Sequence, residues 1–438
     1  MAERVGFEPT YRLLTDNSIS SRARYGQLRY LSARRRRFLY RKNPVRASPF
    51  SLDAAGRIWH TSSPARFRVP SSAGVLPVPF PSSRHMVMIR LSALGDVALT
   101  TGVLMRWRET LGLTFTVLTR ESFAPLFFRH PAVREVVGLK TDELRGERQR
   151  RLFRALAARF RGVPLVDLHG TLRTRLLSLF WKGTVYRYPK YALTRRLFLL
   201  SGGRFGRAPL LARNVPERYA AALAPLRPQG FGRDGLSPFL AVSEDDDDWS
   251  LDALAPLTRH ARPVVALHPF ATHPAKAWPA AHWRELARLL ADQGMAHFWI
   301  GRGDASLFAS APLTGPRGLM SLDFTNRTDL RQLIALLAQA DALVTGDSGP
   351  MHLASGVSTP VVALFGPTCR EWGFFPTGEN DRVLQAPLAC RPCSLHGKTG
   401  AACGHACMRS LTPDMVMEKL RRVLIRPPSA APGTRADG

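Results

Sequence analysis

Asp96 is the first candidate for chemistry, because it stands where an apolar run gives way to a helical pattern. Val87–Leu91 is apolar apart from one arginine, Ser92–Asp96 is a turn rich in small residues, and a helix is expected from Val97 to Thr110. A carboxylate at this place can act as a general base or can simply cap the helix. A nearby helix N-terminus favours the ionised form, which keeps the carboxylate available but makes it a weaker base.

A second segment, Ala342–Ala354, predicts a seat for an anion. An apolar strand runs into Gly346 and Asp347, then into Ser348, Gly349 and a proline at the first turn of a helix. Free backbone N–H groups at the start of a helix bind phosphate well. The Ser348 hydroxyl and His352 are expected to add hydrogen bonds to the same anion, although a capped helix with a structural histidine would have the same pattern.

Lys276 lies in the loop after a third apolar run, Val264–His268. An ammonium group there could neutralise a diphosphate leaving group where other proteins use a metal ion. The alternative is a solvated loop lysine.

Four cysteines near the carboxyl end form two close pairs, Cys390-x2-Cys393 and Cys403-x3-Cys407. Four thiolates at such spacings could hold a structural Zn²⁺, or they could remain free thiols. With five cysteines in 438 residues, the chain is no disulfide-stapled secreted scaffold. We expect no metal at the catalytic site and no required cofactor.

Several nucleotide-site patterns are absent or misleading. No G-x-x-x-x-G-K-[ST] loop occurs, and no G-x-G-x-x-G follows the first strand-like run, which argues against a P-loop nucleotidase and a dinucleotide oxidoreductase. The acidic run Asp245–Asp248 resembles a metal-binding Asp-x-Asp motif, but a run of one acid in a connecting segment predicts a solvated face.

The elements that position these residues follow a strand, turn, helix, strand order that occurs twice. Such repetition predicts two α/β units with parallel sheets, whose ligands lie at the carboxyl ends of the strands. We expect a leader at residues 1–85, an N-terminal Rossmann-like domain at 86–242, a linker at 243–257, a C-terminal Rossmann-like domain at 258–424 and a disordered tail at 425–438.

The net charge of +29 is distributed unevenly. Residues 1–85 carry +12, residues 86–240 carry +17, and the remainder is neutral. The leader has a run of four arginines, Arg34–Arg37, and no apolar core of a signal peptide. Three interpretations stay open for it: an extension ahead of a start at Met86 or Met88, a disordered basic tail, or a nucleic-acid-binding arm. No apolar run is long enough for a membrane-spanning helix.

Taken together, these segments resemble the heptosyltransferases of glycosyltransferase family 9. The resemblance covers about Met88 to Leu424. It rests on the turn before Val97 and on six further matches: Val166–Arg173, with His169 where the family has Gln, Glu217-Arg218-Tyr219, Thr272–Pro279, Asp347–Ala354, Ala363–Thr368 and Cys403-x3-Cys407-Met408.

This resemblance implies a GT-B fold, with two facing Rossmann-like domains, and an inverting, metal-independent transfer of heptose from ADP-heptose to the lipopolysaccharide inner core. It assigns the catalytic base to Asp96. It assigns donor binding to Thr272, Lys276, Asp347, Ser348, Gly349 and His352. Asp304 falls near a family glutamate that contacts the nucleoside. The acceptor would be a phosphorylated glycolipid contacted by Arg120 and Arg173.

The resemblance also implies a cytoplasmic protein, peripheral on the cytoplasmic face of the inner membrane, where the basic N-terminal half would meet anionic lipid. Nucleic acid is not expected as a partner. Two alternatives stay open: a transferase of the same fold that uses another sugar nucleotide, and a basic nucleic-acid-binding protein without catalysis, which salt-dependent DNA binding would reveal.

Overall fold

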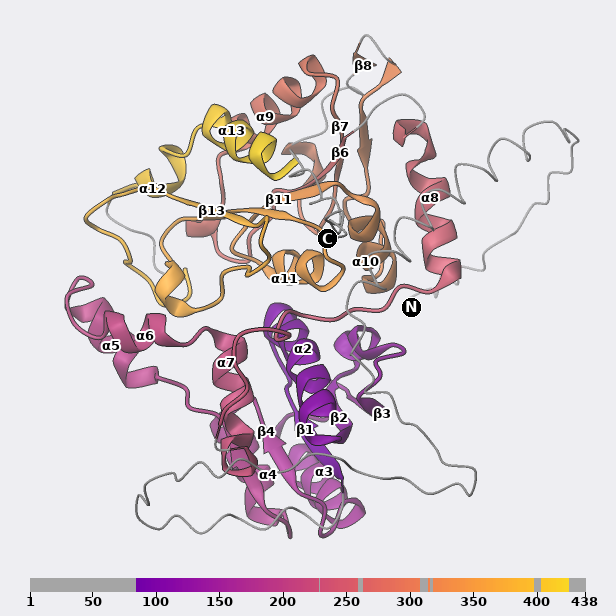
Figure 1. The fold of residues 1–438 in the computed structure, drawn as a ribbon, viewed down its shortest axis with the longest axis vertical. Coiled ribbons are helices and arrows are strands. Elements are labelled where there is room, and N and C mark those ends of the chain that lie inside the picture. The colour runs from indigo at the N-terminus through magenta and orange to yellow at the C-terminus, as the bar shows by residue number, and fades with distance from the viewer. Residues whose placement is uncertain are drawn as a thin grey trace, which may run out of the picture. The chain divides into compact units, whose positions relative to one another are not determined.

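The computed structural model describes residues 84–227, 229–258, 263–307, 314–315, 318–397 and 403–424, and all of them belong to one compact unit. The predicted leader and tail lie outside the described residues, except for the leader's last two positions. Two parallel sheets with helices around them make up this unit (Figure 1). The expectation of two Rossmann-like α/β units is therefore confirmed.

The first sheet has the strand order β3-β2-β1-β4-β5, and all its pairings are parallel. Its central strand is an apolar run that is buried from Met86 to Ile89, as expected where helices cover both faces of a parallel sheet. The chain builds outward from β1 in one direction and then returns to add β4 on the other side. The bounds of the strands are β1 His85–Ile89, β2 Thr114–Arg120, β3 Val133–Leu139, β4 Leu165–Asp167 and β5 Val185–Arg187.

Six described α-helices belong to this N-terminal lobe, and α2, the longest of them, has nine buried residues. It ends at Gly112, whose φ of 65° is left-handed and suits a glycine. A 3₁₀ helix, Glu121–Phe127, with Pro125 inside it, follows β2. The helices are α2 Leu94–Leu111, α3 Gly146–Arg159, α4 Leu172–Phe180, α5 Ala192–Leu200, α6 Arg207–Ala212 and α7 Val215–Ala220.

The second sheet has the order β10-β7-β6-β11-β12-β13, again with parallel pairings throughout. A small antiparallel pair, β8 Thr314–Gly315 and β9 Gly318–Leu319, is separate from it. The strands of the main sheet are β6 Val264–His268, β7 Ala296–Trp299, β10 Ser321–Asp323, β11 Ala342–Gly346, β12 Val361–Phe365 and β13 Arg382–Gln385. Its helices are α9 Ala280–Asp292, α10 Leu330–Gln339, α11 Gly349–Gly356, α12 Ala406–Arg409 and α13 Pro413–Leu424.

The predicted linker with its acidic run is a helix, α8 Glu244–Thr258, and not a solvated connection. Asp246 pairs with Arg331 of α10, while Leu254 and Leu257 are buried. Four acidic residues in the first turn suit the positive end of the helix dipole. The acidic run therefore starts a helix that packs on the C-terminal lobe.

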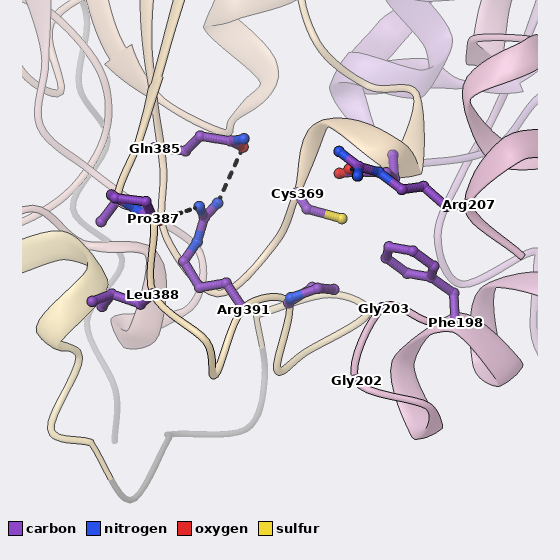
Figure 2. A pocket seen from close by; sticks show the side chains of 12 residues that line it. Phe198, Gly202, Gly203, Arg207, Cys369, Gln385, Pro387, Leu388 and Arg391 are labelled. Carbon is purple, nitrogen blue, oxygen red and sulfur yellow. Dashed lines mark hydrogen bonds and ion pairs between the residues drawn. The ribbon is translucent and has the colours of Figure 1, made fainter. Parts of the chain in front are cut away.

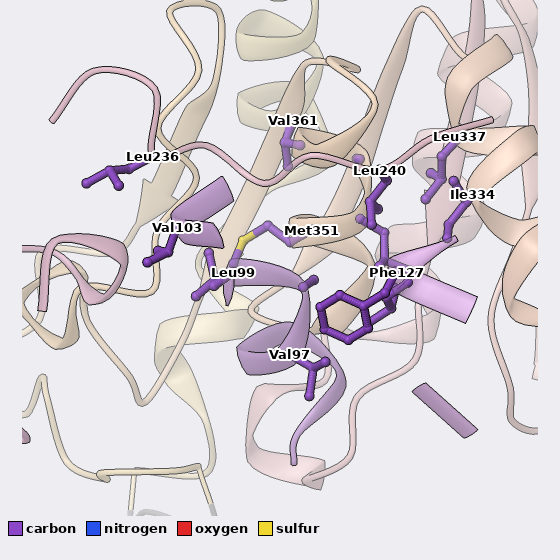
Figure 3. Close-up of a cluster of buried hydrophobic side chains, with 14 of the residues drawn as sticks. Val97, Leu99, Val103, Phe127, Leu236, Leu240, Ile334, Leu337, Met351 and Val361 are labelled. Atoms are coloured by element: carbon purple, nitrogen blue, oxygen red, sulfur yellow. The ribbon is translucent and has the colours of Figure 1, made fainter. Parts of the chain in front are cut away.

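One hydrophobic cluster extends from α2 to the helices α10 and α11 of the other lobe (Figure 3). Val97, Leu99 and Val103 of α2 belong to it, together with Met351 of α11 and Leu240 of the connecting segment. The two lobes therefore share buried apolar contacts beside the ends of their central strands.

Each sheet has a point where the chain reverses its direction of building, and ligands bind there in open α/β sheets. In the first sheet this point lies between β1 and β4, and in the second between β6 and β11. Asp96 follows β1, Lys276 follows β6, and Asp347 follows β11. The fold thus brings the sequence-predicted residues to the two expected ligand positions.

Candidate active site

Asp96 lies in the first turn of α2, and its two carboxylate oxygens have different partners. Oδ1 is 2.6 Å from Nη2 of Arg90 and accepts a hydrogen bond of 2.8 Å from the Tyr219 hydroxyl. Oδ2 accepts a 3.2 Å hydrogen bond from the backbone N–H of Ala93. Asp96 therefore does cap its helix, but through one oxygen only, and the carboxylate is 20% exposed.

The surroundings of Asp96 hold it in the ionised form. Burial alone would raise the pKa of this carboxyl group, but the Arg90 guanidinium and the hydrogen bonds from Tyr219 and Ala93 outweigh burial and lower the pKa below its ordinary value. At neutral pH the group is a carboxylate ready to accept a proton.

Arg90 and Tyr219 both contact the candidate base Asp96, and sequence reasoning did not assign either of them to the site. Arg90 is 6% exposed, donates to the backbone oxygen of Leu168 at 2.5 Å, and lies with its guanidinium carbon 5.3 Å from the centre of the Tyr219 ring. Burial opposes the charge of Arg90, but Tyr219 and Asp96 raise its pKa above the ordinary value. The signal available in the sequence was a lone arginine at the end of an apolar strand, together with Tyr219 in a recognised motif.

His169 follows β4 and lies beside the same group of residues. The backbone N–H groups of His169 and Gly170 both donate to Oδ1 of the buried Asp167, at 3.0 and 2.7 Å. Burial and the charges of Arg90 and Lys190 lower the pKa of His169 to about 3, so its imidazole is neutral. Its Nδ1 atom is buried without a hydrogen-bond partner among the described residues.

Cations gather around His169, because Arg90, Lys190 and Arg173 all act on it electrostatically. Lys190 packs close to Gly170, where a Cβ atom would come within 2.9 Å of its Cε. Burial and Arg90 lower the pKa of Lys190. Arg173, predicted to contact the acceptor, therefore acts on His169 and has no described contact with Asp96, and Lys190 is a further cation near His169 that the sequence reasoning missed.

Arg120, the other predicted acceptor residue, is the last residue of β2 and is partly buried. Its Nε atom is buried and has no hydrogen-bond partner in the described part of the chain. No described contact joins Arg120 to Asp96 or to His169.

Lys276 and Asp347 form an ion pair in the C-terminal lobe. Nζ of Lys276 is 2.6 Å from Oδ2 of Asp347, and both side chains are about one-sixth exposed. The Thr368 hydroxyl donates to the same oxygen at 2.8 Å. Gly397, with a φ of +77°, lies against the lysine stem, where a Cβ atom would meet Cε at 2.6 Å. The Lys276 side chain is therefore fixed by its ion pair and by packing, and it is not a solvated loop lysine.

Ser348 caps α11 by position, but its hydroxyl does not bond to the helix N–H groups. It lies instead 2.9 Å from the Thr345 hydroxyl and 3.3 Å from Nδ1 of His268. Burial lowers the pKa of His268 to about 4, so this imidazole is neutral. The Ser348 side chain therefore leaves the first N–H groups of α11, beginning with that of Gly349, uncapped, and their binding of an anion stays a prediction.

The two lobes touch where α2 crosses α11. A Cβ atom on Gly95 would come within 2.6 Å of the His352 ring, and one on Gly349 within 2.8 Å of Leu94. Burial lowers the pKa of His352 to about 4, and both Asp347 and Asp96 act on its charge. His352 therefore lies between the candidate base of one lobe and the candidate donor residues of the other.

Two other residues that the resemblance assigns to donor binding, Thr272 and Asp304, lie in exposed segments. Thr272 is exposed in the loop after β6. Asp304 is exposed and accepts hydrogen bonds from the backbone and hydroxyl of Ser306, at 3.0 and 2.6 Å. The structure brings Asp96, His352, Asp347, Lys276 and Ser348 into one neighbourhood, and it gives neither Thr272 nor Asp304 a described contact with them.

The cysteines Cys390, Cys393, Cys403 and Cys407 are free. Within the described ranges, which include all four, no group of three or more His, Cys, Asp or Glu side chains is arranged to hold a metal ion. A structural zinc site at these cysteines thus has no preformed ligand group.

A pocket of about 320 Å³ borders the C-terminal lobe and the α5–α6 connection (Figure 2). Phe198, Gly203 and Arg207 line one side, and Cys369 and Arg391 the other. Arg391 donates to the backbone oxygens of Gly366, Ala386 and Thr368, at 2.5, 2.7 and 2.8 Å. Its guanidinium therefore holds the loop whose Thr368 bonds to Asp347, and it has little capacity left for a ligand.

No described helix combines the length and the apolar character needed to cross a membrane.

Comparison with known proteins gives relatives of one kind. The chain is 31% identical to lipopolysaccharide heptosyltransferase 2 of Escherichia coli over 196 residues, which are 44% of this chain and 55% of that protein. It is 28% identical to lipopolysaccharide heptosyltransferase 1 of Pseudomonas aeruginosa over 323 residues, 70% of this chain and 86% of that protein. The chain thus spans about half of the length of the E. coli protein that it matches.

The fold has a similar match among solved structures. The structure of E. coli ADP-heptose lps heptosyltransferase II aligns with a TM-score of 0.58 at 23% identity, over 78% of this chain and 98% of that one. This likeness identifies the two facing Rossmann-like lobes as a GT-B fold. The sequence model of glycosyltransferase family 9 (heptosyltransferase) matches residues 150–400, more than half of the chain. The chain therefore belongs to glycosyltransferase family 9.

Proposed function

We propose that this protein transfers heptose from ADP-heptose to a hydroxyl of the lipopolysaccharide inner core, with inversion at the anomeric carbon. Family membership and the similarity to lipopolysaccharide heptosyltransferases support the reaction class. The observation that carries the site assignment is the contact of Gly95 with His352, because it brings the Asp96 carboxylate, next to Gly95, close to α11.

The reaction is a single displacement. The acceptor hydroxyl oxygen forms a bond to the anomeric carbon, the bond from that carbon to the diphosphate oxygen breaks, and Asp96 takes the hydroxyl proton. Oδ2 is the oxygen suited to this step, since Oδ1 already accepts from Arg90 and Tyr219. A general base contributes a factor of about 10²–10⁴ to the rate.

ADP leaves with growing negative charge, which Lys276 and the start of α11 stabilise. An ammonium has three donors, and Asp347 engages Lys276 through its carboxylate and its backbone oxygen, at 2.6 and 3.4 Å. A remaining N–H is available to a phosphate oxygen, beside the N–H of Gly349. With this positive charge supplied by the protein, the proposed transfer needs no metal ion and no other cofactor.

The acceptor we propose is a phosphorylated glycolipid, met by the cations near His169. Arg173 and Lys190 lie close to that side chain, and their charge favours an acceptor that carries phosphate. Such an acceptor places the protein in the cytoplasm, peripheral on the inner membrane. Arg120 remains a predicted acceptor contact, and Thr272 a predicted donor contact.

A panel of sugar nucleotides tests the proposal. The full chain is incubated with ADP-heptose, other ADP-sugars and UDP- or GDP-sugars, together with a truncated lipopolysaccharide acceptor, and the product is identified by mass. We expect transfer from ADP-heptose, and loss of transfer in Asp96→Asn with ADP binding retained. Transfer from a different sugar nucleotide alone would assign the alternative donor, and near-normal turnover of Asp96→Asn would remove Asp96 as the base.

A further inference from the structure

Helix α5 exposes a stripe of leucines that no described part of the protein covers. Leu193, Leu197 and Leu200 are 80%, 49% and 85% exposed. Their spacing of four and seven residues places them on one face of the helix, which they share with Arg196. The opposite face is anchored, because Phe198 is buried with its ring centroid 5.6 Å from that of Trp372.

The exposed apolar surface continues beyond α5. Phe205, in the turn after the helix, is 63% exposed, and Leu211 of α6 is 42% exposed. Of the nine large apolar side chains that the described residues expose, five lie on α5, on α6 or in the turn between them. Single exposed leucines are ordinary, but a concentration of this kind marks a contact surface.

The charge of the same segment has one sign only. Between Asp167 and Glu217 the sequence has no acidic residue and ten lysines and arginines. Arg196, Arg204 and Arg213 are exposed and form no ion pair within the described residues. Arg207 is the exception, since it pairs with Glu371 at 3.2 Å. The partner of this surface must therefore be negative as well as apolar.

We propose that the surface formed by Leu193, Arg196, Leu197, Leu200, Arg204, Phe205, Leu211 and Arg213, the α5–α6 surface, docks on an anionic phospholipid bilayer. Negative headgroups above hydrocarbon match arginines interleaved with leucines. Long arginine side chains can reach the phosphates while the leucines enter the acyl region. A nucleic acid would satisfy the arginines but would leave the leucines in water.

The surface is tied closely to the candidate active site. Arg218 of α7 is buried and donates to the backbone oxygens of Leu210 and Trp372, at 2.8 and 3.0 Å. Tyr219, the next residue, donates to Asp96. Docking through α5 and α6 would therefore hold the base at a fixed height above the lipid, which suits a glycolipid acceptor; in this respect the inference rests on the proposed function.

Vesicle binding tests the surface directly. The full chain is sedimented with vesicles of phosphatidylglycerol and phosphatidylethanolamine, and with vesicles of phosphatidylcholine alone. The apolar variant is Leu193→Gln with Leu200→Gln, and its control is Met415→Gln, an exposed residue of α13. The charge variant is Arg196→Gln with Arg204→Gln, and its control is Arg284→Gln with Arg421→Gln, which removes the same charge from the C-terminal lobe. All variants keep the leader, so its contribution is constant.

We expect tight binding only to the anionic vesicles. The leucine variant should bind at least about tenfold more weakly, the charge variant about tenfold more weakly, and both controls as the unmodified chain does. Equal binding by the leucine variant and the Met415 control would overturn the proposal. If only the charge variant bound the vesicles more weakly, the proposal would also be overturned, because such a result would indicate a polyanion as the partner in place of a bilayer.

Transfer to a delipidated, soluble acceptor separates this inference from the proposed function. The leucine and charge variants should transfer heptose to such an acceptor at the unmodified rate. If the unmodified chain transfers nothing while the variants still differ in vesicle binding, the proposed function fails and the docking surface stands. If transfer is normal and the variants do not differ in vesicle binding, the docking surface fails and the proposed function stands.

Discussion

The two oxygens of Asp96 divide their tasks. Oδ1 is fixed by Arg90 and Tyr219, and Oδ2 accepts only from the backbone of Ala93. When one oxygen of a carboxylate is fixed, its second oxygen points in a set direction. A general base needs this orientation to take the proton from one particular acceptor hydroxyl. The ion pair that orients Asp96 also weakens it as a base, because it lowers the pKa. Orientation is thus obtained at the expense of basicity.

Tyr219→Phe separates these two effects. The ring would keep its edge contact with Tyr188, at 4.9 Å between centroids, while the hydrogen bond to Asp96 is lost. Since that bond favours the carboxylate, its removal raises the pKa of Asp96. We expect the acidic limb of the kcat/KM profile to move to higher pH, with a stability loss of about 1 kcal/mol.

Tyr186→Phe is the matched control, because Tyr186 is also buried in this lobe but does not contact Asp96. Its profile should coincide with that of the unmodified enzyme. If Tyr219→Phe leaves the acidic limb in place, Asp96 is not the group that this limb reports.

At this scale the sequence predicted the residues better than their pairings. Asp96, Lys276 and Asp347 each follow a strand-like run, which is a local signal. The bond of Lys276 to Asp347 and that of Tyr219 to Asp96 join positions far apart in the chain. Neither composition nor spacing contains that information, so the ion pair and the role of Arg90 became visible only in the structure.

Helices α2 and α11 each have two glycines seven residues apart, one at the crossing of the helices and one against the segment that connects the lobes. On α2, a Cβ atom at Gly95 would meet His352 at 2.6 Å, and one at Gly102 would overlap the backbone oxygen of Ser237. On α11, Gly349 faces Leu94, and Gly356 faces Leu240. The segment that connects the lobes therefore lies across both helices, with Leu240 donating its N–H to Gly356 at 3.0 Å.

Gly95→Ala tests this crossing. A methyl group would press on a buried imidazole, and overpacking of this kind costs about 1–3 kcal/mol. We expect a loss of that size in the free energy of unfolding, measured with urea, together with weaker transfer, because the base moves relative to the donor residues. Gly346→Ala is the control for stability, since its Cβ atom would find its nearest neighbour at 3.6 Å. Equal stability of the two variants would mean that the crossing tolerates the added volume.

The strands and most helices followed from apolar periodicity, and helix α8 is the instructive difference. Four acidic residues in a row carry no apolar period and so predicted a solvated connection. In the structure three of these aspartates, together with Glu244, occupy the first turn of a helix, where the dipole favours them, and Asp246 pairs with Arg331. The apolar contacts of Leu254 and Leu257 come from another part of the chain, which a local pattern does not reveal.

The whole molecule buries several neutral histidines, and this gives its stability a pH dependence. Burial is the largest cause that lowers the pKa of His130, His268 and His352 to about 4, and that of His169 and His297 to about 3. In the unfolded chain these groups titrate near 6.5. Between those values the unfolded state binds more protons, so stability falls as the pH is lowered.

We therefore expect the free energy of unfolding to be highest above pH 7 and to decline below about pH 6.5. Each buried histidine contributes a loss of roughly 1 kcal/mol by pH 5.5. Urea unfolding at a series of pH values measures the slope, and His297→Gln should reduce it by one histidine's share. A stability that stays level from pH 7.5 to 5 would contradict the buried neutral state of these side chains.

The contact of Gly95 with His352 has a further consequence for natural variation in the family. The two positions lie in different lobes and divide one small volume between them, so their sizes are bound to vary inversely. A relative with a side chain at the first position would need a smaller residue at the second, and the double exchange Gly95→Ala with His352→Ala should be less harmful than the sum of its parts. Covariation of these two positions would then show that the two lobes pack against each other, even in relatives that keep no other contact between the lobes.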